Sequence, residues 1–166
     1  MRIGAVLCAA WLLTGCGTAR SAPPVTDGFV CRAAMQYREM AVEGELTCTT
    51  DGAASLSFTL PKSLQGIALH WDGRSMAMEL GNMSLEVPSD KVPESALIRC
   101  MLSVLTAVHP TGSLTEEGYV IEGEAEGTAY RLVCDPTSGL PLSLSVPSQE
   151  LEAVFTDMTR LQDPTP

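Results

Sequence analysis

The feature that most constrains this fold is an alternation of apolar and polar residues with a period of two. Leu56, Phe58 and Leu60, for example, alternate with serine and threonine. Successive side chains of a strand point to opposite faces of a sheet, so this pattern predicts half-buried strands. We expect strands at residues 29–37, 42–48, 55–60, 64–71, 75–80, 83–87, 119–123, 128–134, 140–146 and 151–158.

Turn signals separate most of these segments, and they indicate hairpins. They include Asp51-Gly52, Asp72-Gly73, Glu117-Gly118 and the run at 135–139. Short strands that are joined by such turns form antiparallel sheets. The sequence therefore predicts one mainly antiparallel sheet.

One segment, at residues 94–108, has helical spacing instead. Pro93 suits an early helical position and Pro110 stops the helix. A helix with so few polar side chains must be largely buried. We therefore predict a mainly β (α+β) domain, in which a curved sheet surrounds one buried central helix. The apolar side chains of this helix are Leu97, Ile98, Met101, Leu102, Val104, Leu105 and Val108.

The first residues predict export and lipidation. Arg2 supplies a positive charge, and residues 5–13 form an apolar run that is far shorter than the ~20 residues of a membrane-spanning helix. The run ends in Leu13-Thr14-Gly15-Cys16, which resembles the bacterial lipobox. This resemblance implies cleavage before Cys16 and attachment of a diacylglycerol to its thiol. The alternative is an ordinary signal peptide with an incidental cysteine.

Four regions follow from these patterns. We expect a signal peptide at 1–15, a lipidated Cys16 with a flexible tether at 16–27, a β domain at 28–158 and a C-terminal tail at 159–166. Acyl chains contribute ~0.8 kcal/mol for each buried CH₂, so two or three chains anchor a protein stably. The expected location is the extracytoplasmic face of the cell membrane.

Charge and cysteine content narrow the classes of partner. The net charge is −10, which disfavours nucleic acid and adsorption to anionic lipid. The spacing of the cysteines fits no metal motif, and we expect neither a metal nor a cofactor.

Beyond Cys16 there remain Cys31, Cys48, Cys100 and Cys134. They suggest disulfides Cys31–Cys48 and Cys100–Cys134, with buried free thiols as the alternative.

The order of lipobox, paired strands, buried helix and closing strands resembles the LolA/LolB-like lipoprotein-carrier superfamily, which includes LppX/LprG-type envelope proteins. The stretches that carry the resemblance are 29–46, 57–66 and 135–144. It implies a half-open β-barrel whose concave face holds an apolar cavity for acyl chains. Residues at apolar phase that would line this cavity are Met35, Phe58, Met76, Met78, Met83, Leu97, Met101 and Leu105.

Three functions can be compared with these patterns. The first is binding of a lipid, acyl chain or other hydrophobic ligand, against the alternative of an ordinary filled core. The second is a tethered interaction or structural lipoprotein of the cell envelope or of spore germination, whose glutamates receive a basic partner protein. The third, catalysis, is disfavoured, because neither His70 nor His109 belongs to a recognisable catalytic motif. The glutamates are Glu43, Glu45, Glu79, Glu86, Glu122, Glu124 and Glu126.

Overall fold

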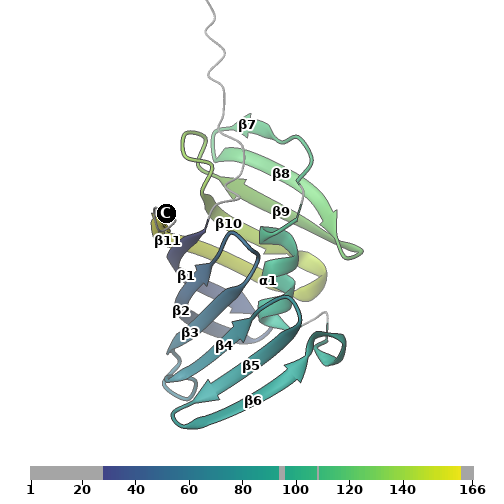
Figure 1. Ribbon diagram of the computed structural model, residues 1–166. Coiled ribbons are helices and arrows are strands. Elements are labelled where there is room, and N and C mark those ends of the chain that lie inside the picture. The colour runs from purple at the N-terminus through teal and green to yellow at the C-terminus, as the bar shows by residue number, and fades with distance from the viewer. Residues whose placement is uncertain (1–27, 94–95, 108, 162–166) are drawn as a thin grey trace, which may run out of the picture.

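The computed structural model describes residues 28–93, 96–107 and 109–161. Within these ranges the chain forms an 11-stranded antiparallel sheet that curves around one α-helix, α1 (Figure 1). The sheet order is β6-β5-β4-β3-β2-β1-β11-β10-β9-β8-β7, so β6 and β7 are its two edges. The strands are β1 Phe29–Tyr37, β2 Met40–Cys48, β3 Ala54–Leu60, β4 Ile67–Trp71, β5 Ser75–Leu80, β6 Met83–Pro88, β7 Ser113–Thr115, β8 Gly118–Ala125, β9 Thr128–Cys134, β10 Pro141–Val146 and β11 Leu151–Arg160.

Two antiparallel meanders make up the sheet. The first runs from β1 to β6 and the second from β7 to β11, and the pairing of β1 with β11 joins them. The helix α1, Leu97–Leu105, lies in the chain between β6 and β7. This architecture confirms the predicted curved, half-open sheet with one central helix. The chain also forms short 3₁₀ helices at Ser89–Lys91 and Pro147–Gln149.

The alternation of the sequence places side chains on the two faces as expected. In β1 every second residue from Phe29 to Tyr37 is buried, and the intervening side chains face outward. We call the side packed against α1 the inner face and the opposite side the outer face. Strand β11 continues to Arg160, which pairs with Phe29. The domain therefore extends two residues into the segment that was expected to be a tail.

The helix is shorter than predicted but is buried as predicted. It spans Leu97–Leu105, and residues 94, 95 and 108 of the expected segment lie outside the described residues. The Leu102 carbonyl accepts hydrogen bonds from both the backbone N–H of Thr106, at 2.9 Å, and the Thr106 hydroxyl, at 2.7 Å. The buried residues of α1 are Ile98, Cys100, Met101, Leu102 and Val104.

An ion pair fixes the helix against the second meander. The Arg99 Nε atom lies 3.4 Å from a carboxylate oxygen of Glu126, in the β8–β9 turn. The same guanidinium donates a hydrogen bond of 2.6 Å to the carbonyl of Val92. These bonds tie α1 to chain segments on both sides of it. No helix in the described part of the chain is long and apolar enough to cross a membrane.

Candidate functional site

The inner face carries a continuous apolar row from the covered to the open part of the sheet. Leu46, Leu56, Leu69, Met78 and Leu85 are successive cross-strand partners on β2 to β6. Leu46 and Leu56 are fully buried, Leu69 is half-buried, and Met78 and Leu85 are 39% and 56% exposed. The same face is thus closed core at one end and open surface at the other.

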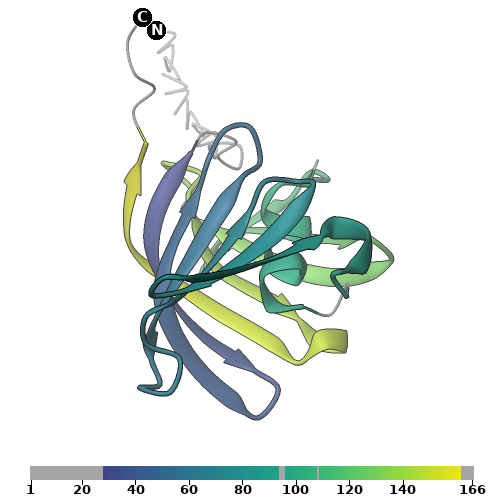
Figure 2. The same ribbon diagram turned by 60° about the horizontal axis from the view of Figure 1, so that its bottom comes forward.

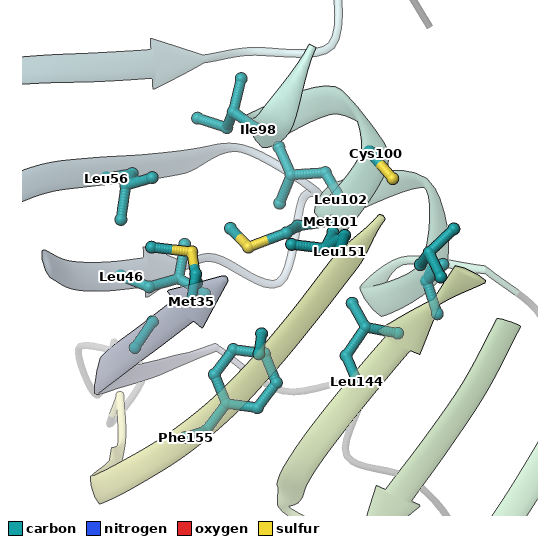
Figure 3. Close-up of a cluster of buried hydrophobic side chains, with 14 of the residues drawn as sticks. Met35, Leu46, Leu56, Ile98, Cys100, Met101, Leu102, Leu144, Leu151 and Phe155 are labelled. Atoms are coloured by element: carbon teal, nitrogen blue, oxygen red, sulfur yellow. The ribbon is translucent and has the colours of Figure 1, made fainter. Parts of the chain in front are cut away.

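The region beneath α1 is filled by the side chains of the protein itself. Figure 3 shows Met35, Leu46 and Met101 in the space between the helix and the sheet. Met35, Phe58 and Met101 are buried members of this core, and Leu97 and Leu105 are half-buried at its margin. With Met76, which is also packed against it, six of the eight residues expected to line a cavity lie in or against the packed core.

The region over β4 to β6 is open. Met76 is half-buried against the core, while Met78, Leu80, Met83 and Leu85 are exposed. Met83 is 68% exposed although it faces the inner side with its partner Leu80. We call Met78, Leu80, Met83 and Leu85 the apolar terrace. An exposed apolar patch of this kind is typical of an interaction site.

The length of α1 explains why the terrace is uncovered. A helix of nine residues is about 13 Å long and about 10 Å wide. Neighbouring strands lie about 4.8 Å apart, so such a helix covers only two or three strands. The outer strands of the first meander therefore extend past it (Figure 1).

Sequence reasoning included the two methionines of the terrace but missed its two leucines. Met78 and Met83 were expected to line a cavity, whereas Leu80 and Leu85 were not. The signal was present, because Leu80 is in phase with Met78 and Leu85 is in phase with Met83. Pairing of these strands brings all four side chains onto one face.

The four cysteines of the domain are free, buried thiols in the structure, in place of the expected Cys31–Cys48 and Cys100–Cys134 bridges. Cys31 pairs with Leu46 and Cys48 pairs with Phe29, so the first two cysteines are diagonal neighbours. Diagonal positions lie about 7–8 Å apart, beyond the usual disulfide spacing. Burial, with smaller effects of Glu45 and of Cys31 respectively, raises the pKa of Cys31 and of Cys48 to about 12.

Each of the two histidines contacts another side chain of the domain. His70 lies on β4, and its Nε2 atom is 3.4 Å from a carboxylate oxygen of Glu79. His109 hydrogen-bonds through Nδ1 to the Tyr130 hydroxyl at 2.8 Å, and burial lowers its pKa. His109 is therefore a half-buried structural residue. Among the described residues no group of three or more His, Cys, Asp or Glu side chains is arranged to hold a metal.

Most of the expected acidic face lies on the outer side of the sheet. Glu45, for example, pairs with Arg32 and Ser57, and Glu122 pairs with Arg131. Glu126 is the exception, because it binds Arg99 at the helix. The lipobox residues Leu13, Thr14, Gly15 and Cys16 lie outside the described residues.

Comparisons with known proteins concern the fold. Neither the protein-family models nor the curated proteins give a match. An uncharacterised conserved protein from Thermus thermophilus has a similar structure, with a TM-score of 0.52 and 13% identity over 84% of this chain and 82% of that one.

Two further solved structures are similar. A LolA superfamily protein from Nitrosomonas europaea has a TM-score of 0.47 and 12% identity, over 86% of this chain and 90% of that one. A domain from Vibrio parahaemolyticus, named for outer membrane lipoprotein sorting, has a TM-score of 0.44 and 8% identity, over 86% and 89%. The sequence resemblance implied a half-open sheet around one helix, and the described residues have this arrangement.

Proposed function

We propose that this protein is a lipid-anchored, extracytoplasmic lipoprotein that binds an acyl chain or another hydrophobic ligand on the apolar terrace. The observation that carries the proposal is the exposure of four large apolar side chains on the inner face of β5 and β6. Two of them are methionines, whose flexible side chains adapt to ligands of different shape. The ligand would lie over β4 to β6, beside the packed core and not within it.

Burial of the terrace supplies the driving force. Removing apolar surface from water contributes about 25 cal/mol for each Å². An acyl chain that covers Met78 and Leu85 also meets the half-buried Leu69 of the same row. The packed side chains beneath α1 limit the ligand on one side. The apolar terrace is therefore an open surface site for one flexible chain.

A paired variant tests this site. Met78 and Leu85 face each other across β5 and β6, so M78S/L85S removes the centre of the terrace. E86Q on the outer face of the same hairpin is the matched control. We expect M78S/L85S to lose the fluorescence enhancement of the neutral probe N-phenyl-1-naphthylamine, while E86Q keeps it. Native mass spectrometry of the protein from membranes shows whether a lipid-sized mass is lost in parallel. Equal probe binding by M78S/L85S and the wild type would reject the terrace as the site.

Anchoring through Cys16 is tested separately. C16S should abolish lipidation and leave an uncleaved precursor, which intact mass distinguishes from the mature lipidated form. Normal maturation of C16S would exclude the proposed lipobox. Neither result affects the experiment on the terrace.

A tethered interaction protein is the second candidate function. It is favoured by the packed core beneath α1, which leaves no need for a ligand there, and by the glutamates on the outer face. A clean protein mass without bound lipid would favour this candidate.

A further inference from the structure

A β-bulge turns one leucine of β3 away from the core. Glu43 pairs with Leu60 while the next residue, Gly44, pairs with Phe58, so β3 contains one extra residue, Thr59. An extra residue reverses the facing of the residues that follow it. Phe58 is therefore buried on the inner face, whereas Leu60 lies beside Glu43 on the outer face and is 45% exposed.

The bulge depends on a close approach of two backbones. A Cβ atom on Gly44 would lie only 2.6 Å from the carbonyl oxygen of Ser57. Glycine at this position allows β2 and β3 to come together where their register shifts. The outward orientation of Leu60 is thus built into the backbone of the sheet.

Leu60 borders an apolar depression in the outer face. The depression has a volume of about 570 Å³, which is within the ~300–1,000 Å³ of typical binding sites. Val154, Ala34, Glu43 and Leu60 form a cross-strand row on β11, β1, β2 and β3, and Val154 is 53% exposed. The residues that line the depression include Ala34, Ala41, Leu60, Pro61, Val154 and Glu152.

A second hollow continues the first along the same strands. It measures about 480 Å³ and shares Ala34, Glu43 and Leu60 with the depression. Together the two form a groove across β11, β1, β2 and β3, which lie side by side (Figure 2). Four strands at a spacing of about 4.8 Å span roughly 14 Å, the length of about four extended residues. We call this feature the outer groove.

Two carboxylates lie among the apolar side chains of the outer groove, with Glu43 between Ala34 and Leu60 in the cross-strand row and Glu152 two residues before Val154 on β11. Within the described residues, no hydrogen bond or ion pair engages the Glu43 carboxylate. Glu152 accepts a hydrogen bond of 2.6 Å from the Ser145 hydroxyl. The cation that lines the groove, Arg32, lies 3.8 Å from Asp157. The lining of the groove therefore carries three carboxylates, Glu43, Glu45 and Glu152, against one guanidinium, and the net charge of the chain is −10.

We propose that the outer groove binds a short segment of a partner protein in which apolar side chains have lysine or arginine beside them. An apolar side chain packs on Val154 and Ala34, and basic groups meet Glu43 and Glu152. Charge complementarity selects this occupant. The net charge of −10 disfavours a second copy of this chain and an anionic membrane as occupants. The inference deepens the second candidate function and does not depend on the terrace.

The probe is the peptide Lys-Leu-Lys-Val-Lys with blocked ends, and its matched control is Glu-Leu-Glu-Val-Glu. Titration of the isotope-labelled full mature chain by NMR should move the amide signals of residues 34, 43, 60 and 154 with the basic peptide only. Binding should weaken as salt is added. E43K and V154S should each weaken it about tenfold, as expected for the centre of an interface, whereas E79Q, on the outer face of β5, should not.

Three outcomes would overturn the proposal. They are equal binding of the two peptides, signal changes elsewhere than in the outer groove, and unchanged affinity in both E43K and V154S when their spectra show a folded domain. Association of the wild type in sedimentation that V154S abolishes would assign the groove to a second copy and equally reject a basic partner. Probe binding in V154S should stay normal, so failure here is distinguishable from failure of the terrace.

Discussion

Truncation of Met101 distinguishes a packed core from a ligand cavity beneath α1. Met101 is fully buried, and its helix is held by the bonds of Arg99 to Glu126 and Val92. Because the helix is fixed in this way, the site has little freedom to collapse when the side chain is shortened. Core Met→Ala changes cost about 2–5 kcal/mol, and we expect M101A to lower the free energy of unfolding by about 3 kcal/mol.

Met83 provides the matched control, because it was expected to line the same cavity but is 68% exposed. M83A should change the free energy of unfolding by less than about 0.5 kcal/mol. Urea unfolding followed by the fluorescence of Trp71, which lies half-buried on β4, measures both variants. The M101A transition should move to lower urea with an unchanged slope.

A small effect of M101A would refute this reasoning. If the side chain lined a water-filled cavity, its truncation would resemble a surface substitution, cost less than about 0.5 kcal/mol and alter the affinity for hydrophobic ligands. A stability loss of about 3 kcal/mol corresponds to a fall of roughly 10 °C in Tm for a domain of this size. The two interpretations therefore differ by far more than the error of either measurement.

Three further results are expected. Burial lowers the pKa of His109 below its ordinary 6.5, so protonation favours the unfolded chain. The free energy of unfolding should therefore fall as the pH drops below 6.5. Urea midpoints measured between about pH 7 and 5 should fall less in H109Q than in the wild type. G44A should cost about 1–3 kcal/mol because its Cβ meets the Ser57 carbonyl oxygen, and a neutral change would contradict that close approach. The buried thiols of residues 31, 48, 100 and 134 should resist alkylation in the native protein and all react on unfolding without reductant, whereas a mass that shows paired sulfurs would exclude free thiols.

Local periodicity predicted the strands because the facing of a side chain is set by its immediate neighbours. The bounds of β1 and β9 match their predicted ranges, and the helix was located by its 3.6-residue spacing. Strand β7 was not predicted, because three residues are too few to establish an alternation. The length of the covering helix then determined which predicted cavity residues are core and which are surface.

The register between paired strands could not be predicted from local sequence patterns, because it depends on how two separated segments pair. Leu56, Phe58 and Leu60 alternate perfectly in the chain, yet only the first two face the core. Nothing in residues 54–60 alone marks Thr59 as the extra residue. The cysteines illustrate the same point, since the diagonal offset that separates Cys31 from Cys48 depends on the register of β1 and β2.

Deletion of Thr59 tests this register directly. In the bulged strand Phe58 faces inward and Leu60 faces outward, and in a regular strand without Thr59 the same two residues would be adjacent and would keep those orientations. We therefore expect the deletion to cost less than about 1 kcal/mol and to preserve binding of the basic peptide, because it removes only an unpaired residue. If β3 were instead regular in the native sheet, the deletion would drive Leu60 out of the core, and the loss would be the roughly 2–5 kcal/mol of a removed core leucine. Urea unfolding of the deletion variant beside L60S decides between these registers, since L60S should be nearly neutral only when Leu60 is already on the outer face.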